Sequence, residues 1–191
     1  SELSYLWTVN IGMALENIRK WQWINRMNEK INRMWKYDML TQVLNRSGFF
    51  YCAETILQKI KEEKSNAFII FLDIDGLKSV NDNLGHEIGD AFIAKIAGIL
   101  KEVVPKDCLI MRYGGDEFVV FGSCKQAGRM QRIAEDIKAA IKTADQKENR
   151  SYHLAASLGC SLHKSYEMDN LNSLIELADK KMYEEKKNKR R

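Results

Sequence analysis

Hydrophobic residues follow two different periods along this chain of 191 residues. Four segments carry apolar side chains three or four positions apart, the spacing of one helix face: residues 47–64, 85–103, 126–142 and 171–187. Four shorter segments are rich in strand-forming residues: residues 68–72, 108–112, 118–121 and 152–162. The second and third of these are close enough in sequence to form a hairpin. The pattern predicts an α+β domain in which helices flank a mixed or antiparallel central sheet. Ser47 is the expected N-cap of the first of these helices.

Residues 1–36 are predicted to form one long helix, because glycine and proline are nearly absent from them. Apolar residues recur there in two sets, one position out of phase with each other: Ile11, Ala14, Ile18 and Trp21, then Ile24, Met27, Ile31 and Met34. The break is compatible with a local irregularity in a coiled coil. The helix could instead pack on its own domain. The number of large apolar groups favours a parallel dimer, in which a partner covers Trp7, Trp21, Trp23 and Trp35.

Composition is that of one soluble domain with an appended segment, at 45% hydrophobic and 29% charged residues with a single proline. The net charge of +4 is modest, and we expect no nucleic-acid partner. No stretch reaches the ~20 apolar residues of a membrane span. Four cysteines lack the spacing of a metal site, which favours reduced thiols in a cytoplasmic protein. Because the chain begins without Met, we expect a fragment of a longer protein with a sensory domain upstream.

The predicted hairpin carries acidic residues at its tip. Gly114 and Gly115 precede Asp116 and Glu117, between two strand-like runs. Glycines at such a turn accept positive φ and let a ligand or another backbone come close. Two adjacent carboxylates are costly unless a cation or a proton donor compensates their charge. The hairpin therefore indicates a cation-binding site.

A second acidic cluster follows the buried run 68–72. Asp73 and Asp75 come directly after it, and alternation along a strand places them on the same face. An acidic strand end beside an acidic hairpin can hold Mg²⁺, which prefers a few carboxylate oxygens completed by water and phosphate. The alternative is an Asp-Gly turn whose acids are solvated.

Four sequence blocks in a fixed order resemble one known family. They are Gly114-Gly115-Asp116-Glu117-Phe118; the run DIDGLKSVNDNLGHEIGD over residues 73–90; Ala178-Asp179, Tyr183 and Lys186; and Asp38, Leu40-Thr41 and Asn45-Arg46. The chain resembles a GGDEF domain, the catalytic domain of bacterial diguanylate cyclases, over residues 37–191. The resemblance implies the palm-like sheet of nucleotidyl cyclases and polymerases, preceded here by a signalling helix over residues 1–36.

The resemblance also implies a reaction that condenses two GTP into cyclic di-GMP and releases two pyrophosphates. Each domain would hold one GTP, so two domains must face each other, and the N-terminal helix is the expected homodimer contact. The implied metal ligands are Asp73, the backbone carbonyl of Ile74, and Asp116, holding Mg²⁺, which Mn²⁺ could replace. Asp116 or Glu117 would help to deprotonate the attacking 3′-hydroxyl.

By the same resemblance, Asn81 and Asp90 would read guanine, and His86 would contact the substrate. A carboxylate can accept from both N1–H and the exocyclic amine of guanine, and adenine offers no such donor pair. Taken singly, Asn81 fits an ordinary turn residue and Asp90 a solvated helix start. The phosphates would be held by Lys78, Lys186 and Arg190, whereas Lys187, Lys189 and Arg191 are expected to be solvated.

The chain departs from the family pattern at several positions. Leu77 stands where Phe is usual, a mild change. Small residues are usual where Lys181 and Glu185 stand, and glycine where Lys189 stands, which weakens the assignment of Arg190.

Two further departures concern regulation. Pro105 and Cys108 replace the charged ends of an Arg-x-x-Asp product-inhibition motif, so we expect no tight inhibition by cyclic di-GMP through that site. Gln42 and Leu44 replace a glycine and a proline at the start of the domain, which affects the hinge and not the chemistry.

Two other functions remain open. A catalytically silent GGDEF domain could act as a GTP-binding sensor or as a protein-docking module, although such domains usually lose a signature acid and this one has not. An adenine-using or mixed dinucleotide synthase is disfavoured by Asp90.

Overall fold

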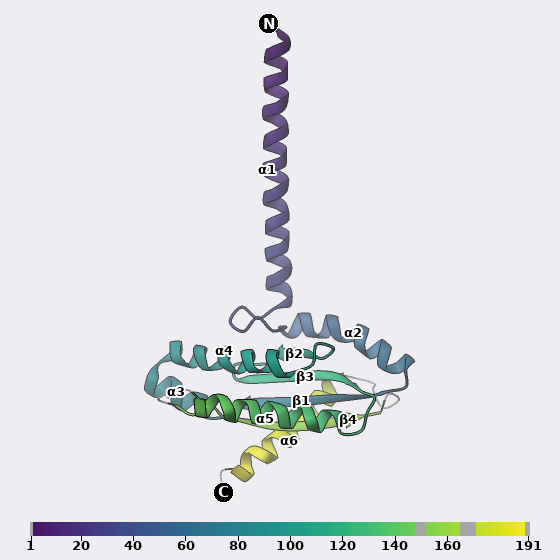
Figure 1. Ribbon diagram of the computed structural model, residues 1–191, viewed down its shortest axis with the longest axis vertical. Coiled ribbons are helices and arrows are strands. Elements are labelled where there is room, and N and C mark those ends of the chain that lie inside the picture. Colours follow the sequence, from purple (N-terminus) through teal and green to yellow (C-terminus); the bar gives the residue numbers. More distant parts are fainter. Residues whose placement is uncertain (1, 148–151, 165–170, 190–191) are drawn as a thin grey trace. The chain divides into compact units, whose positions relative to one another are not determined.

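The computed structural model describes residues 2–147, 152–164 and 171–189, with the backbone alone for residues 2–6 and 8–11 (Figure 1). The chain divides into two compact units, residues 1–35 and residues 36–191.

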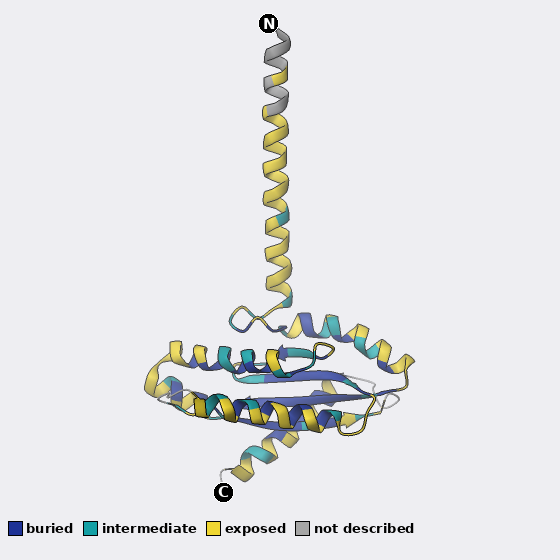
Figure 2. Cartoon of the chain, viewed as in Figure 1, coloured by how far each residue is buried: buried dark blue, intermediate teal, exposed yellow. Residues whose placement is uncertain are grey.

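The first unit is almost entirely helix. α1 runs over Glu2–Lys36, as the sequence predicts for one long helix. Its large apolar side chains are exposed where they are described, and Figure 2 shows most of the described part of α1 as exposed. Trp7, Trp21 and Trp23 are 68%, 65% and 63% exposed.

The second unit is built on a four-stranded sheet. Its strands are β1 (Asn66–Ile74), β2 (Leu109–Arg112), β3 (Glu117–Cys124) and β4 (Ala156–His163), in the order β2-β3-β1-β4. Each of the three strand pairs is antiparallel. The prediction allowed a mixed or an antiparallel sheet, and these strands form an antiparallel one. A single parallel bridge joins Leu44 to Met111 at the edge of β2. The architecture confirms the predicted α+β class.

Within the described residues, these helices accompany the sheet: α2 (Arg46–Glu62), α3 (Leu77–Leu84), α4 (His86–Val103), α5 (Arg129–Lys147) and α6 (Leu171–Lys189). The sequence pattern did not predict α3, because eight residues are too short for a helical period to show. Positive φ angles at Gly76 (81°) and Gly85 (88°) bound this helix. Its buried residues Leu77 and Val80 fix it to the core.

Other boundaries differ from prediction for local reasons. The N-cap of α2 is Asn45, whose side chain accepts from the Gly48 N–H at 2.9 Å, and not Ser47. α5 begins after Gly128, whose φ is 79°. β4 begins only at Ala156, because the Leu154 N–H donates to the Asp145 carboxylate at 2.7 Å and not to a strand.

Apolar residues cover both faces of the central strand β1, and β1 and its neighbour β3 are mostly dark blue in Figure 2. Phe68, Ile70 and Leu72 pack into one core with α4 and α5. Ile69 and Phe71 pack into a second core with α2 and α6. The continuous apolar run of β1 is therefore explained by burial on both sides.

Helix α6 lies directly on β4 because of a glycine. A Cβ at Gly159 would stand 2.1 Å from the Ala178 carbonyl oxygen and 2.2 Å from the Met182 nitrogen. Such distances exclude any side chain at this position. The close approach brings the last turn of α6 to the end of β1, where the acidic residues lie.

Candidate functional site

The end of β1 and the hairpin between β2 and β3 meet side by side, as the sequence predicted. Asp73 is the cross-strand partner of Glu117. The Ile74 N–H donates to the Asp116 carbonyl at 3.0 Å, one step beyond the strand ladder. Asp73, Ile74, Asp116 and Glu117 are thus held together by the backbone of two neighbouring strands.

The hairpin tip uses its glycines for space and not for positive φ. Neither Gly114 nor Gly115 has a positive φ, contrary to the sequence prediction. A Cβ at Gly114 would stand 2.6 Å from the Glu117 Oε2. The Tyr113 N–H closes the turn by donating to the Glu117 carbonyl at 2.8 Å. Gly114 therefore leaves room for the Glu117 carboxylate beside the turn.

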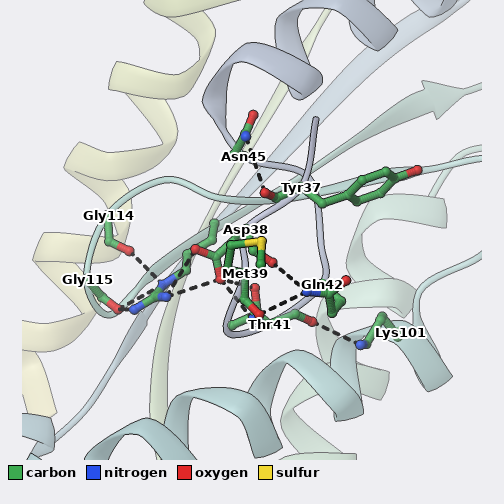
Figure 3. Close-up of polar contacts among 10 residues, drawn as sticks. Tyr37, Asp38, Met39, Thr41, Gln42, Asn45, Lys101, Gly114 and Gly115 are labelled. Atoms are coloured by element: carbon green, nitrogen blue, oxygen red, sulfur yellow. Dashed lines mark hydrogen bonds and ion pairs between the residues drawn. The ribbon is translucent and has the colours of Figure 1, made fainter. Parts of the chain in front are cut away.

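Arg112 holds the hairpin from its base (Figure 3). Its guanidinium donates to the carbonyl oxygens of Gly114 at 3.2 Å and Gly115 at 2.8 Å, and to both oxygens of Asp38 at 3.1 and 3.2 Å. The Asp38 carboxylate also accepts from the Thr41 N–H and hydroxyl at 2.9 and 2.6 Å. Burial opposes ionisation of Asp38, but the Thr41 and Arg112 hydrogen bonds outweigh it and lower the Asp38 pKa.

The segment 37–45 that carries Asp38 is itself well anchored. Lys101 of α4 donates to the Thr41 carbonyl at 3.0 Å, as Figure 3 shows. The backbone of Leu44 makes two hydrogen bonds to β2. Its carbonyl accepts from the Arg112 N–H at 2.9 Å, and its N–H donates to the Ile110 carbonyl at 3.1 Å. The Asn45 N–H donates to the Lys36 carbonyl at 2.9 Å, so the segment connects the start of the second unit to the hairpin.

Gln42 adopts a conformation that suits glycine, with φ of 55°. Its side-chain amide donates to the Met39 carbonyl at 2.9 Å and the Asp38 carbonyl at 3.3 Å. These bonds offset the strain of a left-handed non-glycine residue. The departure at position 42 therefore leaves the turn intact.

The acids at this site repel one another. Burial, and then the neighbouring charges of Asp116, Asp73 and Asp179, raise the Glu117 pKa. Burial also raises the Asp73 pKa, opposed by an ion pair with the Lys186 ammonium. Lys186, on α6, is thus the cation that the structure places directly on the acidic cluster.

The residues expected to read guanine lie on α3 and α4. Asn81 is on α3, and its Oδ1 is buried with no hydrogen-bond partner among the described residues. A Cβ at Gly89 of α4 would stand 1.8 Å from that oxygen. Asp90 follows Gly89, and both Asp90 and His86 are exposed on α4. Asp90 therefore directly follows, in sequence, the glycine against which the Asn81 side chain lies.

The residues expected to hold phosphate are divided between two elements and the chain end. Lys78 is exposed on α3, and Lys186 lies against Asp73. Arg190 lies outside the described residues, so its predicted role stays a prediction.

A family profile described as "Diguanylate cyclase, GGDEF domain" matches residues 35–191. The chain belongs to this family. Diguanylate cyclase A of Treponema denticola is 29% identical over 193 residues, covering 99% of this chain and 52% of that protein. Diguanylate cyclase VdcA of Vibrio cholerae is 32% identical over 168 residues, covering 85% and 48%. The chain spans about half the length of these curated relatives.

Among solved structures, the coiled coil and GGDEF domain of DgcB from Caulobacter crescentus, in complex with c-di-GMP, superposes with a TM-score of 0.80. It is 23% identical, and the match covers 93% of this chain and 94% of that one. At this identity the likeness shows the fold alone.

The predicted metal ligands of this GGDEF domain fit a hard, oxygen-preferring cation. In the described part of the chain, no group of three or more His, Cys, Asp or Glu side chains is placed so that it could hold a metal ion by itself. The predicted set contains two carboxylates and one carbonyl. Mg²⁺ suits such a set, because it keeps several waters and takes substrate phosphate oxygens. Burial, with the neighbouring carboxylates adding to it, raises the pKa of Asp73 and of Glu117, so a bound cation would stabilise their ionised forms.

Sequence reasoning missed one part of the site. Lys189 is exposed, as expected, but its ammonium also contacts Asp75 at 3.1 Å, Ser157 at 3.1 Å and the Ala156 carbonyl at 2.7 Å. The spacing places Lys189 on the same helix face as Lys186, but the sequence alone does not show that β4 lies beside this face.

The region of the missing product-inhibition motif is internally paired. Arg129 donates to both oxygens of Asp107 at 2.6 and 2.7 Å. Burial raises the pKa of Cys108 to about 11, so this thiol is uncharged at neutral pH. The prediction that product binds weakly there stands untested.

None of the helices in the described part of the chain has the length and apolar character that a membrane span requires.

Proposed function

We propose that this chain is a diguanylate cyclase domain that condenses two GTP into cyclic di-GMP and two pyrophosphates. The observation that carries the proposal is the meeting of Asp73, Ile74, Asp116 and Glu117 at one strand end, beside the Lys186 ammonium. The intact acidic hairpin and the family membership support it.

In each step a ribose 3′-oxygen forms a bond to an α-phosphate, and the bond from that phosphorus to pyrophosphate breaks. The proton of the 3′-hydroxyl passes to a nearby base, for which Asp116 and Glu117 are the candidates. A raised pKa makes Glu117 a better proton acceptor than an ordinary carboxylate, because base strength rises with pKa. Mg²⁺ bound by Asp73, the Ile74 carbonyl and Asp116 would stabilise charge on the phosphate and favour the ionised hydroxyl.

The remaining residues would bind and orient GTP. The unpartnered Oδ1 of Asn81 can accept from the guanine exocyclic amine, and Asp90 can accept from N1–H. Lys186 would exchange Asp73 for phosphate oxygens, joined by Lys78 and Arg190. Since phosphoryl transfer depends mainly on positioning and charge neutralisation, these contacts account for most of the expected rate.

A homodimer would bring two such sites together. The exposed tryptophans of α1 support a partner helix, because large apolar side chains at one helix surface are normally covered. We assign residues 1–36 to this dimerising and signalling helix and residues 37–191 to the catalytic domain. An upstream sensory domain in a longer cytoplasmic or membrane-attached protein would supply the input.

The test compares turnover with binding in the wild type and in Asp116→Ala. Incubation with GTP and Mg²⁺ is expected to yield cyclic di-GMP in the wild type, and at least about 100-fold less in the variant. Calorimetry with GTP is expected to show binding in the wild type. Binding without any turnover in dimeric wild type would favour the GTP-sensing alternative, and absence of both would favour a docking module. An equal mixture of GTP and ATP separates guanine-only from mixed products.

A further inference from the structure

The last turn of α6 carries a lysine whose contacts are all internal to the protein. The Lys189 ammonium lies 2.7 Å from the Ala156 carbonyl oxygen, 3.1 Å from the Ser157 hydroxyl and 3.1 Å from the Asp75 carboxylate. An ammonium has three donors, and these three acceptors use all of them. The charge of Glu185, 3.4 Å away and one turn back, adds to the attraction. Each donor of Lys189 therefore has an acceptor within the protein, while 45% of the side chain stays exposed.

These acceptors lie on β4 and directly after β1, the strand whose end carries the predicted metal ligands Asp73 and Ile74. Asp75 follows the end of β1, and its N–H donates to the Ala155 carbonyl at 2.9 Å. The hydroxyl of Ser157, which is fully buried on β4, donates to the Asp75 carboxylate at 2.9 and 3.0 Å. Lys189 thus closes a cluster that joins α6, β4 and the end of β1.

Two parallel lysine–aspartate contacts connect α6 to the end of β1. Lys186 pairs with Asp73, and Lys189 pairs with Asp75 one helical turn further on. Ile74 lies between the two aspartates, and its carbonyl is a predicted metal ligand. Fixing Asp75 therefore restricts the backbone at Ile74, and fixing the helix end restricts Lys186.

We propose that Lys189 is a positioning residue for the nucleotide site: it anchors Asp75 and the last turn of α6, and so holds the Ile74 carbonyl and the Lys186 ammonium in place for bound GTP. The inference rests on the proposed function, since it concerns how that same site is held. Its rival is that Lys189 leaves Asp75 and binds phosphate itself. The full use of the three donors favours the positioning role.

Calorimetry with 3′-deoxy-GTP and Mg²⁺ tests this, because the analogue lacks the attacking hydroxyl and cannot react. Lys189→Met keeps an unbranched stem and removes the charge. We expect its Kd to rise about five- to tenfold, in line with the loss of a charge-assisted contact. The matched control is Lys187→Met, which removes the same charge from the same turn, where Lys187 lies 4.5 Å from the Tyr183 ring centre. Its Kd is expected to stay within about twofold of the wild type.

A double-mutant cycle with Asp75→Asn separates positioning from direct binding. If Lys189 acts through Asp75, the Lys189→Met penalty shrinks to less than about twofold in the Asp75→Asn background. An undiminished penalty in that background would contradict the proposal and indicate direct phosphate binding. Faster amide hydrogen exchange in residues 185–189 of ligand-free Lys189→Met is the second expected result, and thermal unfolding of each variant verifies the fold.

The outcomes distinguish a failure of the Lys189 proposal from a failure of the proposed function. Wild type that binds the analogue while Lys189→Met binds it equally well would overturn this inference alone. Wild type that does not bind the analogue would overturn the proposed function and this inference with it. Should Lys189→Met unfold, Lys189→Arg carries the test: it retains the charge, cannot reproduce all three short contacts, and is expected to weaken binding about two- to threefold.

Discussion

Two glycines on α4 differ in the space that surrounds them. Gly89 leaves room for the Asn81 amide, which has no hydrogen-bond partner among the described residues at its Oδ1, whereas a Cβ at Gly98 would meet nothing within 4 Å. A buried acceptor without a partner is costly, and Asn81 is a predicted guanine-reading residue, so we expect bound GTP to supply the missing donor. Residue Gly89 is therefore expected to act on base recognition through Asn81.

Gly89→Ala is expected to displace Asn81 and raise the KM for GTP about tenfold, since losing one buried hydrogen bond costs about 1–3 kcal/mol. Discrimination against ATP should fall with it. The control Gly98→Ala should leave KM unchanged and raise the free energy of unfolding by ~1 kcal/mol, because alanine favours a helix interior over glycine. Steady-state kinetics with both nucleotides decides, and an unchanged KM in Gly89→Ala would remove Asn81 from base recognition.

The raised pKa of Glu117 has a consequence for stability. A carboxyl whose pKa is raised by folding stabilises the native state only below its ordinary pKa, and this contribution is lost as pH rises through the folded value. Burial and then Asp116, Asp73 and Asp179 raise the Glu117 pKa, so ionised Glu117 destabilises the metal-free protein at neutral pH.

Glu117→Gln is therefore expected to raise the Tm at pH 7 in the presence of a chelator. The gain should shrink at pH 4, below the ordinary value of 4.5, where Glu117 is mostly protonated in both states. Glu135→Gln, at an exposed position of α5, should show no such difference. A loss of Tm at pH 7 in Glu117→Gln would mean that the carboxylate is compensated, against the electrostatic account.

At the scale of elements, the segment 37–45 and the hairpin form one unit through Arg112. The guanidinium uses Nη1 for both oxygens of Asp38 and Nε and Nη2 for two hairpin carbonyls, and a lysine ammonium cannot place donors at these three positions. The side chains of this pair are 16% and 23% exposed, so solvent screens them less than a surface pair. Arg112 therefore links the hairpin that carries Asp116 and Glu117 to the start of the domain at Asp38.

Arg112→Lys is expected to lower kcat for cyclic di-GMP formation at least about tenfold, because displacement of reacting groups by a fraction of an ångström costs rate steeply. Arg129→Lys is the matched control, since Arg129 likewise contacts both oxygens of an aspartate, Asp107, through one nitrogen, and does so away from the hairpin. Both variants should lose similar stability, by about 1 kcal/mol, while only Arg112→Lys loses rate. Equal kcat values in the two variants would show that the clamp does not position the acids.

The sequence predicted the elements that have a long period or a strong strand signal, and it failed where short-range geometry decides. The long helix, the buried strand and the acidic hairpin were predicted. Helix α3 was missed, because only its flanking glycines and two buried residues define it. The meeting of Asp73 with Glu117 could be anticipated from an acidic strand end and an acidic turn. The Lys189 cluster could not, since it depends on the approach of α6 to β4 at Gly159.

At the scale of the whole molecule, one domain would bind only one of the two GTP molecules that the proposed reaction joins. In the proposed reaction, the acids of one site would activate the ribose of one GTP, and the α-phosphate under attack would belong to the GTP of a second domain. The exposed apolar residues of α1 would supply a means of pairing. Activity should therefore depend on association, and the chain is expected to be slow when dilute even though each domain binds GTP.

The measurement that tests this most directly is the rate of cyclic di-GMP formation per domain across protein concentration, at saturating GTP and Mg²⁺. The account predicts that the rate per domain rises with concentration and then levels off, at the concentration where sedimentation shows the dimer. Cyclic di-GMP formed at a constant rate per domain in a concentration range where the protein is monomeric would contradict the shared site. Absence of cyclic di-GMP from fully dimeric protein would contradict the proposed activity itself.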